Sequence, residues 1–190
     1  LDNNGSYRTW MWNSYQNTIV SGWGNADDWL ITPKFQLSND NLYALRYTIN
    51  GSGDLRTTVG KGNTPEDQDE NILDDVQGYK TNDYETHELY FRPSDNDTYN
   101  FGLYNYGVGD DCYWSIKSLS VKPVAKASAP DMVRSLQFTP DAGGALGATL
   151  SFTVPVTAIN GSSLSSVSKV TVYDLDGNVL GTAESVAPGA

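Results

Sequence analysis

Apolar and polar residues alternate along this chain in short runs of strand length. The runs in the longer, N-terminal part are Trp29–Leu37, Leu42–Ile49, Glu88–Phe91, Tyr99–Tyr106 and Tyr113–Val121. A period of two places successive side chains on opposite faces of a sheet. Turn-forming sequences such as Asn50-Gly51-Ser52-Gly53 separate the runs. The pattern therefore predicts an all-β, antiparallel domain.

One segment departs from this alternation. At the start of Thr64–Val76 a threonine that could cap a helix precedes Pro65, and acidic residues crowd the first turn. Further on, Ile72, Leu73 and Val76 would share one face of a helix. We predict a short helix in this segment.

The composition changes after residue 122, where alanine, serine and proline predominate, as is typical of a linker. We expect a first domain over residues 1–122, a linker over 123–129 and a second domain over 130–190. The second domain has four predicted strands: Ser135–Thr139, Ala148–Val154, Lys169–Leu175 and Asn178–Ala183. An immunoglobulin-like sandwich has about seven strands. We therefore expect an incomplete sandwich, whose uncovered apolar face favours self-association.

Charge limits the partners. The chain carries 12 Lys and Arg against 23 Asp and Glu, for a formal net charge of −11. Such an acidic surface repels phosphate backbones and anionic lipid, so we predict no nucleic-acid partner. No apolar run approaches the length that crosses a bilayer, so we also predict no membrane insertion.

Several aromatic residues are candidates for ligand binding, because exposed tryptophan and tyrosine rings stack on sugar rings. The candidates, which lie among Asn, Gly and Ser, are Trp10, Trp12, Trp23, Tyr104 and Tyr106. Alternation places Trp10 and Trp12 on one face, both in the core or both exposed. Trp23, between two glycines in a predicted loop, is the foremost candidate. The alternative for any of them is core packing, which we assign to Trp29 and Trp114.

Residues suited to catalysis are few. His87 is the one histidine, and no serine elbow or second imidazole accompanies it. Cys112 follows two aspartates, whose charges disfavour its thiolate. Acidic residues are abundant, yet no pair has the apolar surroundings that a glycosidase acid requires. We predict that the chain is not an enzyme.

The segment Asn25–Pro33 resembles the signature of the cleaved adhesin family, also called choice-of-anchor J, which is related to MAM-like jelly rolls. The resemblance continues through Leu42–Tyr47 and Val59–Asp67, and Tyr113–Val121 is similar to the family's closing strand. It covers about residues 1–122. It implies a jelly-roll β-sandwich whose first strand precedes this sequence.

The segments Ala129–Val133 and Ala148–Pro155 resemble the start of a fibronectin type III module. Such modules commonly follow this jelly roll in surface proteins of gut and oral anaerobes. The resemblance therefore implies a partial fibronectin-type-III-like sandwich over residues 130–190.

The family also suggests a metal. Calcium takes about six to eight oxygen ligands from carboxylates and amides, which suits an acidic chain. In the family an acidic N-terminal loop and acidic residues near the last strand meet around calcium. The corresponding residues here are Asp2, Asn4, Asp28, Asp110 and Asp111. The alternative is that they are solvated turn and capping residues.

Relatives of this kind are secreted or exposed on the bacterial cell surface and serve in adhesion or in binding of glycans or host proteins. We therefore predict an extracellular, non-catalytic adhesion or binding module, with a glycan or a host extracellular protein as its partner. The alternative is a purely structural spacer, or an accessory domain of a larger secreted glycosidase or protease.

Overall fold

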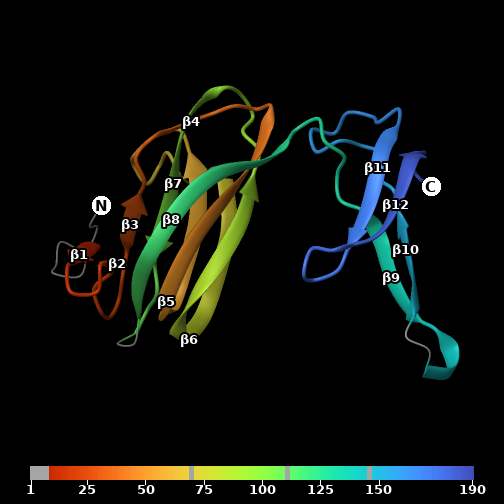
Figure 1. The fold of residues 1–190 in the computed structure, drawn as a ribbon. Coiled ribbons are helices and arrows are strands. Elements are labelled where there is room, and N and C mark those ends of the chain that lie inside the picture. The colour runs from red at the N-terminus through yellow and green to blue at the C-terminus, as the bar shows by residue number, and fades with distance from the viewer. Residues whose placement is uncertain (1–8, 69–70, 110–111, 145–146) are drawn as a thin grey trace. The chain divides into compact units, whose positions relative to one another are not determined.

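The computed structural model describes residues 9–68, 71–109, 112–144 and 147–190. The chain divides into two compact units, Leu1–Ala125 and Lys126–Ala190. Among the described residues the regular elements are strands, apart from one 3-10 turn at Ala142–Gly144 (Figure 1). In the same residues we find no helix with the length and apolarity needed to span a membrane. The prediction of an all-β fold is confirmed.

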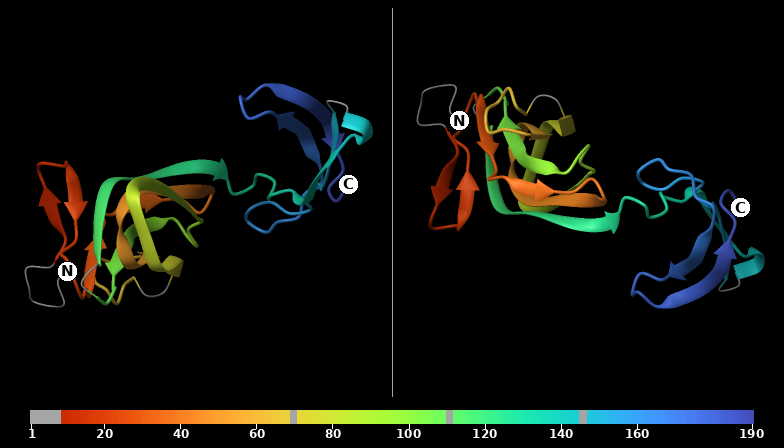
Figure 2. Two further views of the ribbon diagram at one scale, coloured as in Figure 1. Left: turned by 90° about the horizontal axis from the view of Figure 1, so that it is seen from below. Right: turned by 90° about the horizontal axis from the view of Figure 1, so that it is seen from above.

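The first unit is a curled antiparallel sheet. Its strands are β1 (Met11–Asn13), β2 (Thr18–Val20), β3 (Asp28–Ile31), β4 (Phe35–Leu37), β5 (Asn41–Gly60), β6 (Asn71–Phe91), β7 (Asp97–Asn105) and β8 (Tyr113–Lys126). Their order is β1-β2-β8-β5-β7-β3, with β6 paired to β5 and β4 paired to β7. The sheet curls so that its two halves enclose one core, as in a jelly roll (Figures 1 and 2).

The long strand β5 joins the two halves. Its first part, from Tyr43 to Ile49, pairs with the end of β6, and its second part, from Leu55 to Gly60, pairs with β7. Between these parts the register with β6 shifts twice, after Ile49 and after Gly53. The sequence predicted a turn at residues 50–53. The structure has a bend within a continuous strand instead, because both flanking parts find partners in the same sheet.

Two glycines make the bend possible. The φ angle of Gly51 is +153°, and a Cβ atom there would lie 2.2 Å from the Tyr113 carbonyl oxygen and 2.9 Å from the Trp114 Cα. At Gly53, with φ +121°, a Cβ atom would lie 3.0 Å from the Cys112 sulfur. Strand β8 therefore packs directly on the backbone of β5 at this point, which only glycine permits.

The core lies between the two halves of the sheet. Tyr47 from the first part of β5 and Thr57 from the second share a buried hydrogen bond of 3.0 Å between their hydroxyls. Burial raises the pKa of Tyr47 to about 12. The core is a cluster of buried apolar side chains, and Trp114 lies fully buried within it, as predicted. Its other members are Leu37, Tyr43, Leu45, Tyr47, Ile49, Leu55, Val59, Tyr99, Phe101, Leu103 and Ile116. Trp29 is buried as well, but it lies outside this cluster.

The predicted helix at residues 64–76 is wrong. One capping-type contact does form, since the Thr64 backbone N–H donates to the Asp67 carboxylate at 3.1 Å. That contact closes a single turn, however, because β6 begins at Asn71 and its residues Ile72 and Val76 pair with β5. Pairing within the sheet outweighs the local helical signal.

The second unit contains two separate hairpins. Strand β9 (Arg134–Pro140) pairs with β10 (Ala148–Thr153), and β11 (Val167–Tyr173) pairs with β12 (Val179–Val186). Its buried apolar residues are Ala127, Val154, Ala158 and Val167, whereas Met132, Leu136, Phe138, Leu150, Tyr173, Leu175, Val179 and Leu180 are exposed. The expected linker at 123–129 is partly strand, since β8 extends to Lys126.

The contact between β5 and β8 makes Gly51 sensitive to substitution. We expect Gly51→Ala to lower the free energy of unfolding by about 3 kcal/mol, because the added methyl group meets backbone atoms at a strained φ. Gly78→Ala is the matched control: Gly78 has φ +61° and nothing within 4 Å of an added Cβ. It should cost only about 1 kcal/mol. Urea unfolding measures both, and equal effects would contradict the packing argument.

The exposed face of β9 generates a second prediction. Leu136 and Phe138 are 61% and 69% exposed and project from the same face of this edge strand. We expect the chain to self-associate with rising concentration and the double variant Leu136→Ser/Phe138→Ser to be less associated. Gln137→Ser, on the opposite face, serves as the control. Sedimentation equilibrium that finds monomer throughout would reject this prediction.

Candidate functional site

A cleft opens on the outer face of the first unit, and we name it the Trp23 cleft. Its lining comes from the β1–β2 hairpin, the loop after β2, the β5 bend, β6 and β8: Asn13, Gln16, Val20, Ser21, Trp23, Asn50, Asn82, Tyr84, Tyr113 and Ser115. In β8, Tyr113 and Ser115 alternate with a buried core residue and therefore face outward. The volume of about 440 Å³ is within the range of small-molecule sites, about 300–1,000 Å³.

Trp23 forms an aromatic wall of this cleft. Its indole stacks on the Tyr113 ring, with centroids 4.4 Å apart and an interplanar angle of 21°. The side chain is nevertheless 63% exposed, so much of its apolar surface faces solvent. Two hydrogen bonds hold the preceding loop against β8: the Ser21 N–H donates to the Trp114 carbonyl at 2.8 Å, and the Trp114 N–H donates to the Ser21 hydroxyl at 2.8 Å.

The rest of the lining consists mainly of amides and hydroxyls. The Asn13 amide donates to the Gln16 side-chain oxygen at 3.0 Å. The hydroxyls of Tyr84 and Ser115 are 2.8 Å apart. Each amide side chain carries two N–H donors and an oxygen that accepts two bonds, so these contacts leave further hydrogen-bonding capacity in the cleft. None of the ten lining residues is Asp, Glu, Lys, Arg or His.

Trp23 is thus the one ligand-binding candidate from the sequence that lies in this cleft. The amides and the two tyrosines were not predicted, because they come from segments far apart in the sequence. Asn50 and Asn82 look like ordinary turn formers, and only the folding of β5, β6 and β8 side by side brings them together.

Trp10 and Trp12 lie in different surroundings. Trp10 packs partly buried against the core, and its indole N–H donates to the Asp28 carbonyl at 3.3 Å. Trp12 is 60% exposed. The expectation that both share one burial state is wrong, because β1 begins only at Met11 and alternation does not extend to Trp10.

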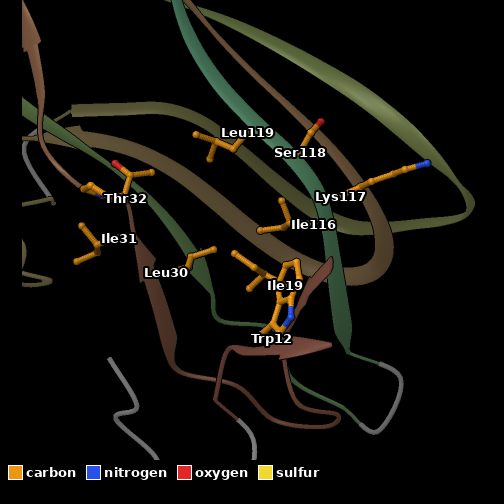
Figure 3. A pocket seen from close by; sticks show the side chains of 10 residues that line it. Trp12, Ile19, Leu30, Ile31, Thr32, Ile116, Lys117, Ser118 and Leu119 are labelled. Carbon is orange, nitrogen blue, oxygen red and sulfur yellow. The ribbon is translucent and has the colours of Figure 1, made fainter. Parts of the chain in front are cut away.

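Trp12 lines a second hollow of about 320 Å³, whose lining is mostly apolar (Figure 3). Its residues are Trp12, Ile19, Leu30, Ile31, Thr32, Pro33, Ile116, Lys117, Ser118 and Leu119. Figure 3 shows Ile19, Leu30 and Ile116 gathered together, while the Lys117 side chain extends away from them. This hollow offers a hydroxyl-rich ligand few hydrogen-bonding partners.

Tyr104 and Tyr106 belong to an aromatic ladder elsewhere on the unit. The Tyr104 ring stacks on Trp29 at 4.5 Å and on Tyr106 at 5.3 Å, measured between centroids. The Arg56 guanidinium carbon lies 5.2 Å from the Tyr106 centroid. Burial and a hydrogen bond to Asp75 raise the pKa of Tyr106. These ring faces are occupied by contacts within the protein.

The predicted calcium ligands are only partly visible: Asp2, Asn4, Asp110 and Asp111 lie outside the described residues. Asp28 is fully buried on β3, in register with the fully buried Asn105 of β7. Their carboxylate and amide oxygens are of the type that calcium binds. Within the described ranges, however, no group of three or more His, Cys, Asp or Glu side chains could hold a metal. Calcium binding stays a prediction.

His87 packs against two tyrosine side chains. Its ring stacks on Tyr47 with centroids 5.3 Å apart, and its Nε2 lies 3.4 Å from the Tyr79 hydroxyl. Cys112 is buried beneath the β5 bend at Gly53. His87 is thus half-buried on β6, whereas Cys112 is buried next to the start of β8.

No protein-family model matches the chain, and no curated protein matches it. Among solved structures, it is similar to the K1 cleaved adhesin domain of Lys-gingipain from Porphyromonas gingivalis W83, with a TM-score of 0.52 and 13% identity over 66% of this chain and 89% of that domain. The K3 domain of the same protein gives 0.50 and 13%, over 64% and 86%. At this identity the likeness concerns the fold, and the predicted jelly-roll architecture is confirmed.

The calcium site that would include the buried Asp28 can be tested through the stability of the chain. If calcium binds only the folded chain, then about 100 times its Kd adds about 2.7 kcal/mol of stability. We expect millimolar calcium to raise the Tm of the EDTA-treated chain by several degrees, and an equal concentration of magnesium to raise it less. Differential scanning calorimetry measures both. An unchanged Tm after calcium is restored would exclude the site.

Proposed function

We propose that this chain is an extracellular, non-catalytic module that binds carbohydrate through the Trp23 cleft. The observation that carries the proposal is the exposed indole of Trp23, stacked on Tyr113 within a cleft otherwise lined largely by amides and hydroxyls. The apolar C–H face of a sugar ring packs against an aromatic ring, and its hydroxyl groups bond to amides. The cleft offers both kinds of partner within one site.

The exposure of Trp23 itself supports a ligand. Burial of apolar surface contributes about 25 cal/mol per Å², and tryptophan is among the largest apolar side chains. Without a ligand, Trp23 lacks much of this stabilisation, because the residue is 63% exposed. A sugar ring that stacks on the indole recovers part of it.

The cleft is also built on rigid elements. Tyr113 and Ser115 project from β8, whose neighbouring residue Trp114 is fixed in the core. A site whose side chains are already in place loses less conformational entropy when a ligand binds. This favours useful affinity for a small ligand with few contacts.

The size of the cleft favours a glycan over a host protein. A standard protein–protein interface buries about 800 Å² on each partner, usually around apolar anchors. The Trp23 cleft is a local depression of about 440 Å³ with a mostly polar lining, which matches a short saccharide better.

We further propose that the module belongs to a secreted or surface-attached bacterial adhesin of the cleaved adhesin type, with a fibronectin-type-III-like second unit. Supporting this are the resemblance of Asn25–Pro33 to the family signature and the fold likeness to the gingipain adhesin domains. A structural spacer is the competing function, and it would bind no glycan.

The decisive variant is Trp23→Ala. In a glycan screen the native chain should bind at least one saccharide. Trp23→Ala should weaken that binding at least about tenfold, which is about 1.4 kcal/mol, because it removes both the ring face and the apolar area that a sugar would bury. The variant should lose only about 1 kcal/mol of stability, because the side chain is largely exposed.

Trp12→Ala is the matched control, because Trp12 is similarly exposed at 60% but lines the apolar hollow. It should keep the native affinity. If the two variants lose the same amount of glycan affinity, the binding site lies elsewhere. If the native chain binds no glycan at all, the spacer function stands instead.

A further inference from the structure

We infer that the Trp23 cleft selects neutral saccharides and rejects the same saccharides when they carry carboxylate or sulfate groups. The inference rests on the proposed function and narrows its ligand class. It follows from the side chains that line the cleft and from the charges that surround it.

The lining provides no positive charge. Its polar groups are the amides of Asn13, Gln16, Asn50 and Asn82 and the hydroxyls of serine and tyrosine. These groups donate to and accept from sugar hydroxyls equally well. An anionic group would leave water without gaining an ionic partner, and an unpaired charge is costly to desolvate.

The aromatic rings add to this preference. Trp23 and Tyr113 line the cleft, and the face of an aromatic ring carries partial negative charge. Such a face attracts the C–H groups of a sugar and repels a carboxylate or sulfate. The net charge of −11 on the whole chain acts in the same direction over a longer range.

The lysines closest in sequence to the lining do not alter the balance. Lys117 places its ammonium 5.5 Å from the centroid of the Tyr84 ring, outside the lining of the cleft. Lys80 precedes Asn82 by two residues on β6 and is likewise absent from the lining. Both are exposed, so water and salt screen their charges.

The test uses matched ligands. Each neutral glycan that the chain binds is compared, at physiological ionic strength, with the same glycan after its primary hydroxyls are oxidised to carboxylates. Part of the sample is then reduced back to hydroxyls, which controls for damage to the polymer. We expect the oxidised form to bind at least about tenfold more weakly and the re-reduced form to recover the original affinity.

A gain-of-charge variant tests the physical cause. Asn82→Lys places an ammonium in the cleft at an exposed position. It should reduce the ratio of the affinities for the neutral and the oxidised glycan at least about threefold. Gln16→Lys, also exposed, provides a second cation from the opposite side should the first variant fold poorly. Lys34→Gln, at an exposed position outside the lining, should leave the difference in affinity unchanged.

The outcomes separate this inference from the proposed function. Equal or tighter binding of the oxidised form, lost in Trp23→Ala, would overturn neutral selectivity and keep the cleft as a glycan site. Failure of the native chain to bind any glycan would reject both. If the difference in affinity between the neutral and the oxidised glycan stays the same in Asn82→Lys and in Gln16→Lys, the electrostatic explanation is wrong.

Discussion

The contact between the backbone of Gly51 and β8 is the constraint on which the first unit depends. A Cβ at this position would lie 2.2 Å from the Tyr113 carbonyl oxygen, so no side chain larger than a hydrogen fits between the two strands here. This contact lets β5 bend and take part in both halves of the sheet. The bend in turn brings Tyr47 and Thr57 within hydrogen-bonding distance across the core.

The same contact organises the cleft. Because side chains alternate along β8, packing Trp114 into the core turns Tyr113 and Ser115 to the outer face. Asn50, next to the glycine of the bend, lines the cleft beside them. The loop that carries Trp23 is then anchored through Ser21, which exchanges two hydrogen bonds with the Trp114 backbone. Core and cleft are therefore two faces of one strand.

The strands were predictable because their signal is local. Alternation identified the first part of β5, most of β7 and β8, and all four strands of the second unit, with boundary errors at their ends. It missed the second part of β5 and found only the last four residues of β6. It failed at residues 50–53 and 64–76, where turn and helix signals are real but pairing with distant strands decides the conformation. A sequence pattern cannot show that β8 will supply atoms against Gly51.

The site was predictable only where one residue carried the signal. Trp23 stands out in the sequence because it lies between two glycines in a predicted loop, outside any alternating run that would place it in the core. Asn13, Asn50 and Asn82 do not stand out, because an asparagine in a turn is ordinary. Their importance arises from convergence on one cleft.

Changes in the loop that carries Trp23 and changes in β8 differ in their effect on the stability of the fold. Trp23 lies on a loop and is mostly exposed, so its ring can change with little effect on the fold. Tyr113 is one residue from Trp114, so a change that displaces β8 moves the wall of the cleft and the centre of the core together. The lining of the cleft can therefore vary through the loop and the amides while β8 and the β5 bend stay fixed. This division allows one jelly roll to present different clefts without a new core.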